Sequence, residues 1–73
     1  MSLPSFEGFF KEYVQEIHYF IFAHVQDKET AEDLTSSTFE KALRKWPPRE
    51  TSDHATKAWV FQIAKNAMVD RYR

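Results

Sequence analysis

Apolar side chains recur every three or four residues through most of this chain, and this period is the feature that most constrains its fold. A step of three to four residues places side chains on one face of an α-helix, whereas a strand facing one core alternates at every second residue. No segment shows the alternation of a strand. The sequence therefore predicts an all-α fold.

The first predicted helix runs from about residue 5 to residue 26, with Ser5 as its N-cap. Its apolar stripe is wider than a lone surface helix needs, so we expect it to pack against two neighbours. The stripe consists of Phe6, Phe10, Tyr13, Ile17, Phe20 or Ile21, and His24, and the residues that widen it are Phe9, Val14, Phe22 and Val25.

The second predicted helix runs from about residue 27 to residue 46. Asp27 is expected to cap its first N–H groups, and the acidic residues that follow suit the positive end of the helix dipole. Pro47 and Pro48 end it, because proline lacks an N–H and disfavours helical geometry in the residue before it. Residues 47–53 then form a polar connector. The expected core positions of this helix are Ala31, Leu34, Phe39, Ala42, Leu43 and Trp46.

The third predicted helix runs from about residue 53 to residue 73. Its last residues, Arg71-Tyr72-Arg73, include no glycine, proline or polar tail, so we expect the natural protein to continue beyond them. The prediction for residues 1–73 is one compact domain of three helices, or four if a short extra turn forms. The expected core positions of the third helix are Trp59, Val60, Ile63, Ala64 and Ala67.

The small size of the chain limits how such a fold is held together. Its 73 residues contain no cysteine, so neither a disulfide nor a thiolate metal site can support the core. Seven Phe, three Tyr and two Trp residues supply large apolar surfaces instead. The longest apolar run, residues 19–23, is far shorter than a membrane span, which needs about 20 residues. We therefore expect a cytoplasmic protein without membrane insertion.

The charges divide unevenly along the chain. Residues 1–40 carry a net charge of −6 and residues 41–73 a net charge of +5, although the whole chain sums to −1. The basic half suits a polyanion such as nucleic acid, and the acidic half repels one. Ordinary solvated helix faces explain the same division equally well.

Residues for catalysis or metal binding do not form a convincing set. His18, His24 and His54 lack acidic or cysteine partners at ligand spacing, and a metal site needs three or four converging donors. His24 is expected to be a packed or snorkelling histidine, while His54 in the connector is a candidate for ligand contact. We therefore expect no enzyme activity, no cofactor and no metal.

Two polar stripes remain once the core positions are removed. One lies on the second helix and has small hydroxyl side chains at its centre, which would let another helix approach closely. The other lies on the third helix, where Gln and Asn side chains can bond base edges and cations can meet phosphate. The first stripe contains Asp33, Ser36, Ser37, Glu40 and Arg44, and the second contains Gln62, Asn66, Val69 and Arg73 with Lys65 beside them.

Two ordered motifs resemble a known family. Residues 32–43 read E-D-L-T-S-S-T-F-E-K-A-L and resemble the E-D-L-x-Q-E-T-F-x-x-A segment of region 2.2 in sigma factors of the extracytoplasmic-function (ECF) group. Residues 58–73 read A-W-V-F-Q-I-A-K-N-A-M-V-D-R-Y-R and are similar to the A-W-L-x-x-I-A-x-N-x-x-x-D-x-x-R segment of regions 2.3 and 2.4. Phe6-Glu7, followed by Tyr13, resembles the start of region 2.1. This chain has Ser36-Ser37 where the family has Gln-Glu, and Thr56 where it often has phenylalanine.

The resemblance implies a role in transcription initiation. In that family the region 2.2 helix docks on the clamp helices of the polymerase β′ subunit, and the connector and third helix face the non-template strand of the promoter −10 element. It implies an anti-sigma factor as a further partner, and a C-terminal region 4 that is absent from this chain. The expected polymerase-binding residues are Asp33, Ser36, Ser37, Glu40 and Lys41, and the expected DNA-binding residues are Arg49, Ser52, His54, Lys57, Gln62, Lys65, Asn66 and Arg73, with Trp59 in the core.

Three other classes of protein stay open as alternatives. A helical protein-interaction module without DNA binding explains the aromatic core and the acidic half, but not the two ordered motifs. A helix-turn-helix DNA binder would need a shorter turn than residues 47–53. An enzyme is the weakest alternative, because no catalytic set is present.

Overall fold

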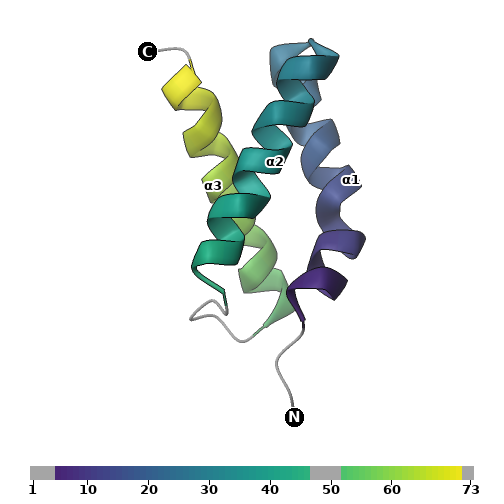
Figure 1. Ribbon diagram of the computed structural model, residues 1–73, viewed down its shortest axis with the longest axis vertical. Helices are drawn as coiled ribbons and strands as arrows, with labels where there is room; N and C mark the ends of the chain where they lie inside the picture. The colour runs from purple at the N-terminus through teal and green to yellow at the C-terminus, as the bar shows by residue number, and fades with distance from the viewer. Residues whose placement is uncertain (1–4, 47–51, 72–73) are drawn as a thin grey trace.

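The computed structural model describes residues 5–46 and 52–71, and within these residues it contains three helices and no strand. The helices are α1 (Phe6–Val25), α2 (Lys28–Arg44) and α3 (Asp53–Arg71). They run up, down and up beside one another, with α1 and α2 joined by a tight turn at one end of the bundle (Figure 1). The predicted all-α, three-helix fold is confirmed.

Polar side chains at the helix starts account for where α1 and α2 begin. Ser5 Oγ accepts a hydrogen bond of 3.0 Å from the backbone N–H of Gly8. The Asp27 carboxylate accepts one of 2.9 Å from the backbone N–H of Thr30 and one of 2.5 Å from the Thr30 hydroxyl. These bonds satisfy N–H groups that a helix leaves without internal partners. Both predicted N-caps are confirmed.

The turn between α1 and α2 needs one residue in the left-handed region. Gln26 has φ 54° and ψ 32°, and its backbone N–H donates to the carbonyl of Phe22 at 2.8 Å. This conformation ends a helix and is more often taken by glycine or asparagine. Because Asp27 caps the next helix at once, α1 and α2 become antiparallel neighbours.

The second helix ends at Arg44, two residues before the predicted end at 46, and Lys45 is its C-cap. The Trp46 N–H still bonds the Leu43 carbonyl at 3.1 Å, in a tightened last turn. The third helix begins directly after Ser52, whose Oγ accepts a 3.1 Å bond from the N–H of Ala55. The connector assigned to residues 47–53 lies mostly outside the described residues.

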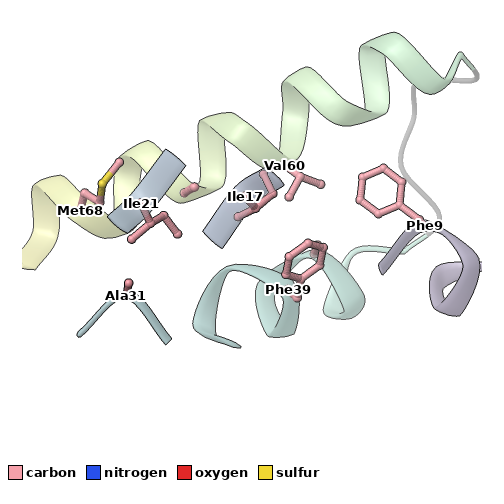
Figure 2. Packing of buried hydrophobic residues seen from close by; sticks show 9 residues of the cluster. Phe9, Ile17, Ile21, Ala31, Phe39, Val60 and Met68 are labelled. Carbon is pink, nitrogen blue, oxygen red and sulfur yellow. The ribbon is translucent and has the colours of Figure 1, made fainter. Parts of the chain in front are cut away.

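The core fills the space between all three helices, and its residues change from aromatic to aliphatic along the bundle axis. Phe9 and Phe39 meet near one end, Ile17 faces Val60 in the middle, and Ile21 lies near Met68 toward the other end (Figure 2). At the aromatic end the Phe9 ring lies 5.3 Å from the Trp46 ring and 4.8 Å from the Tyr13 ring, between centroids. The buried cluster is Phe9, Ile17, Ile21, Ala31, Phe39, Ala42, Val60, Ala64 and Met68.

Several residues expected in the core are on its edge. Phe10 is 37% exposed, and its ring covers Phe39 from outside at 4.9 Å instead of filling the core. Leu43 is 53% exposed and Phe22 is 39% exposed. His24 is exposed, and its Nδ1 forms a hydrogen bond of 2.9 Å with the Phe20 carbonyl one turn earlier. The expectation of burial is wrong for Phe10, Phe22 and Leu43, since only part of each apolar stripe meets a neighbouring helix, whereas His24 packs its ring on Phe20 at 4.9 Å between centroids and stays exposed.

Three threonines occupy core positions that the apolar pattern did not indicate. Thr35, Thr38 and Thr56 are each less than 7% exposed. Each hydroxyl donates to the carbonyl four residues earlier in the chain, at 2.6, 2.7 and 2.9 Å respectively. A buried hydroxyl that bonds its own backbone avoids the cost of an unpaired polar group. These residues therefore pack as small branched side chains, and Thr56 fills the family's phenylalanine position with less volume.

Candidate functional site

The outer face of α2 carries four of the predicted polymerase-binding residues. Asp33, Ser36, Ser37 and Glu40 are exposed, whereas the flanking Thr35 and Thr38 point inward. This division explains the run of four hydroxyl residues in the middle of the helix. The two threonines pack in the core, and the two serines are small exposed side chains between acidic neighbours. Because these serine side chains are short, another helix can approach this face closely.

Charge on this face is partly paired within the helix. Glu40 accepts a 2.7 Å bond from Arg44, and both side chains remain mostly exposed. An exposed pair at this spacing contributes little stability, about 0.3–0.5 kcal/mol. Its main effect is to hold Glu40 along the helix, toward Arg44.

Lys41, the fifth predicted polymerase-binding residue, lies at a different groove from Ser36. Ser36 lines a groove between α1 and α2, together with Gln15, His18 and Tyr19. Lys41 lines the groove between α2 and α3, on the other side of α2. The structure therefore places Lys41 away from Ser36 but one turn after Ser37 on α2, and it lines the same groove as Asn66, one of the residues expected to contact DNA.

The α2/α3 groove has a basic rim and an aromatic wall. It has a volume of about 380 Å³. Two cations of α2 and the cation of its C-cap residue face one amide and one carboxylate of α3 across the groove, so the lining is net positive. Trp59 and Ile63, both half-buried and packed against the core, form its apolar part. The complete lining is Lys41, Arg44, Lys45, Trp59, Ile63, Asn66 and Asp70. Trp59 thus supports the core, as predicted, and also lines this groove.

The predicted stripe on α3 divides between two sides of the helix. Gln62 Nε2 donates to Asn66 Oδ1 at 3.2 Å, and both residues are exposed. This bond aligns the two amides and uses only one polar atom of Asn66. Lys65 is also exposed, but it lines a mainly apolar groove between α1 and α3 with Phe20 and His24. Asn66 therefore lies toward α2, and Lys65 lies toward α1.

The first turn of α3 holds two more predicted DNA-binding residues. Ser52 and His54 are exposed, and the Ser52 hydroxyl oxygen caps the helix. Arg49 and Arg73, also predicted to contact DNA, lie outside the described residues.

Lys57 has a contact that the sequence did not reveal. Its Nζ forms a 2.6 Å ion pair with Oε2 of Glu16 on α1 and lies 5.6 Å from the centre of the Tyr13 ring. The hydrogen bond that Lys57 donates to Glu16 raises the pKa of Lys57, because it stabilises the protonated amine. No sequence signal links Glu16 to Lys57, since the two residues belong to different helices.

The α1/α2 groove contains the other feature that the sequence analysis missed. The His18 ring stacks on Phe22, with centroids 6.2 Å apart, and its Nε2 is buried without a hydrogen-bond partner among the described residues. Tyr19 beside it is 71% exposed. This groove adjoins Ser36 and extends the α2 face toward α1.

Within residues 5–46 and 52–71, no group of three or more His, Asp or Glu side chains is placed to hold a metal ion. None of the helices α1, α2 and α3 is long and apolar enough to cross a membrane.

Comparison with known proteins decides the family. Residues 9–73 match the family described as Sigma-70 region 2. The chain belongs to the sigma-70 region 2 family. It is 31% identical over 70 residues to the ECF RNA polymerase sigma factor SigM of Bacillus subtilis, covering 94% of this chain and 41% of that protein. It is 33% identical over 69 residues to the ECF RNA polymerase sigma factor BldN of Streptomyces coelicolor, covering 94% of this chain and 26% of that protein.

A third relative extends the same result. The RNA polymerase sigma factor YlaC of Bacillus subtilis is 32% identical over 69 residues, which cover 94% of this chain and 39% of that protein. No solved structure gives a significant match. The chain thus spans less than half the length of these relatives, and the resemblance to region 2 of ECF sigma factors is confirmed. It is a sigma factor domain of a family that acts in transcription initiation and is not a family of enzymes.

Proposed function

We propose that this sigma-70 region 2 domain binds RNA polymerase core through the outer face of α2 and captures the melted non-template strand of the −10 element at the α2/α3 groove. The proposal rests on one observation: a single groove is lined by the cations Lys41, Arg44 and Lys45, the amide of Asn66 and the ring of Trp59. Membership of the sigma family and relatives named as RNA polymerase sigma factors support the same partners.

The groove suits one unstacked nucleotide. Its volume of about 380 Å³ lies within the usual range of small-ligand pockets, roughly 300–1,000 Å³. The lysines and Arg44 can meet phosphate oxygens, the Asn66 amide can bond a base edge, and the Trp59 ring offers a face for stacking. Removing a base from the duplex costs a few kcal/mol, and stacking on an aromatic ring returns about 1–3 kcal/mol. Capture of an opened base therefore favours melting without any chemical step.

The charge of the domain supports a shared role with the polymerase. The chain as a whole carries a charge of −1, so long-range attraction to free DNA is weak. The basic groove supplies a local contact only. We therefore expect DNA binding to become strong when polymerase adds its own contacts, and α2 presents its acidic and serine face for that association.

The β′ clamp helices are the proposed docking partner of Asp33, Ser36, Ser37 and Glu40. Exposed acidic groups separated by small side chains suit a helix that carries basic residues, because charge complementarity guides such contacts. An anti-sigma factor that covers the same face is part of this proposal.

A pull-down with polymerase core tests the docking face. The double variant Asp33→Arg with Ser37→Arg is expected to lose core binding while its helical content stays parental, because both side chains are exposed and make no core contact. The matched control is Glu12→Arg, a charge reversal at an exposed position of α1. Retained core binding by the double variant would refute this docking face.

One lysine variant distinguishes the polymerase-binding face from the DNA-binding groove. If Lys41 serves the groove, Lys41→Gln keeps core binding but slows open-complex formation, with a weaker dependence on salt. If core binding falls instead, Lys41 belongs to the polymerase face as the sequence analysis predicted, and the groove loses one of its cations.

The α1/α2 groove favours a second candidate function, a protein-interaction module. Tyr19 and Phe22 are exposed aromatic residues beside the unpaired Nε2 of His18, and such a surface suits a protein partner. Polymerase binding without any effect of groove variants on promoter opening would favour this function over DNA capture.

A further inference from the structure

Lys57 is held between two helices by one carboxylate and two aromatic rings. Its Nζ lies 2.6 Å from Glu16 Oε2, 5.6 Å from the Tyr13 ring centre and 5.8 Å from the Phe61 ring centre. The Lys57 side chain is still 35% exposed and that of Glu16 is 48% exposed. The ammonium group is therefore paired with the Glu16 carboxylate, yet the Lys57 side chain is exposed enough for an anion from solution to approach it.

Lys57 lies on α3 in a row with another lysine, and the ion pair with Glu16 affects one end of this row. Lys57, Phe61 and Lys65 follow one another at steps of four residues and so share one side of the helix. Lys57 and Lys65 are separated by about 12 Å along the helix axis. The two lysines of this row suit the phosphates of a single strand, while the Phe61 ring between them packs against Phe20 of α1, with centroids 5.0 Å apart. At the first position of this row, however, a carboxylate already bonds the cation.

We propose that Glu16 is an intramolecular competitor for a DNA phosphate at Lys57, so that the Lys57 contact with DNA forms only when Glu16 is displaced. A carboxylate and a phosphate both present anionic oxygens to the same ammonium group. This inference rests on the proposed capture of the strand at the α2/α3 groove and extends the path of its phosphates to the α1 side of α3, where Lys57 and Lys65 lie. In the free domain Glu16 fastens α1 to α3 and also keeps Lys57 from binding nucleic acid indiscriminately.

Glu16→Gln tests the proposal in the full-length protein assembled with polymerase core. Glutamine keeps the size of the side chain but removes the ionic competitor. Affinity for single-stranded DNA that carries the −10 element is expected to rise about two- to five-fold at low salt, and the slope of log affinity against log salt to steepen by about 0.7. The gain should be alike for different −10 sequences, because a phosphate contact carries no base information.

Two further variants identify the cause of a gain. Glu7→Gln removes the same charge from the same helix, but its partner is Lys11, in an exposed pair at 3.2 Å, so the salt slope should stay parental. Adding Lys57→Gln to Glu16→Gln should return the slope to the parental value. A parental slope in Glu16→Gln, an equal gain in Glu7→Gln, or a gain that survives in the double variant would overturn the inference.

Failure of the inference is distinguishable from failure of the proposed function. If the parental assembly binds the strand and Lys65→Ala weakens that binding, but Glu16→Gln changes nothing, only the inference falls. If the parental assembly does not bind the strand, the DNA role fails and the inference fails with it. Were Glu16→Gln to unfold, Glu16→Asp decides the question, because its shorter arm loosens the pair while keeping the charge, and an intermediate gain is expected.

Discussion

Phe39 and Leu43 lie one turn apart on α2, and the apolar pattern predicted both as core, but the structure separates them. Phe39 is 3% exposed and packs beneath Phe6, Phe9 and Phe10, with centroid distances of 6.4, 6.3 and 4.9 Å. Leu43 is 53% exposed. Substitution of each residue by alanine therefore removes a similar type of side chain from very different surroundings.

The expected costs follow from burial. A buried phenylalanine cut to alanine costs about 3–5 kcal/mol, because transfer energy is lost and a cavity remains. A domain of this length has a free energy of unfolding of about 4–11 kcal/mol, so Phe39→Ala removes between about a quarter and all of it. Leu43→Ala gives up only part of the 1.5–3 kcal/mol of a fully buried leucine, about 1 kcal/mol. Each kcal/mol lowers the melting temperature of a domain this small by about 4–8 °C.

Thermal and urea unfolding of the 73-residue chain, followed by circular dichroism at the helix band, measures both costs. Phe39→Ala is expected to lose its cooperative transition or to melt at least about 12 °C below the parent, and Leu43→Ala to melt less than about 10 °C below it. Equal destabilisation by the two substitutions would show that Leu43 is a core residue and would refute the packing described for α2.

Three further predictions concern the helix cap, the groove wall and the α3 surface. Hydrogen bonds from Thr30 lower the pKa of the Asp27 carboxyl, so the stability that this carboxylate provides is complete above the ordinary pKa of Asp, about 3.9, and is lost as the pH falls toward the lowered value. Asp27→Asn has no such carboxylate. In urea unfolding, its stability should therefore fall less between pH 5 and pH 3 than that of the parent. Trp59→Ala should destabilise the domain by about 2–3 kcal/mol, since the ring is half-buried, and parental melting together with failed promoter opening would instead assign it to the groove alone. Asn66→Ala should reduce open-complex formation in a manner that depends on the −10 sequence, whereas Lys65→Ala should weaken all promoters alike and flatten the salt slope; parental preference and slope in both variants would exclude α3 as the DNA-reading face.

Local chemistry explains which features could be predicted without coordinates. A cap such as Ser5 or Asp27 acts on N–H groups two or three residues away, so sequence neighbours alone determine it. Helical periodicity likewise depends on spacing along one segment, which is why all three helices were found. The polar faces of α2 and α3 followed from the same spacing, and most of their predicted residues are exposed.

Relations between helices could not be obtained in this way. A stripe as wide as that of α1 contains more apolar residues than two neighbours can cover, and the sequence does not say that Phe9 is covered while Phe10 lies at the edge. The threonines were missed because their burial depends on which sides of α2 and α3 face the other helices, whereas the bond to their own backbone only removes the cost of burying the hydroxyl.

The sequence by itself determined the helices, their caps and the family motifs, because each depends on residues close together in the chain. Only the tertiary structure decided which helix sides face one another. The crossing of α2 and α3 brings Lys41 to Asn66, and the crossing of α1 and α3 brings Glu16 to Lys57. Such contacts depend on how each helix is rotated about its axis, which is set by packing of the whole core and not by any local pattern.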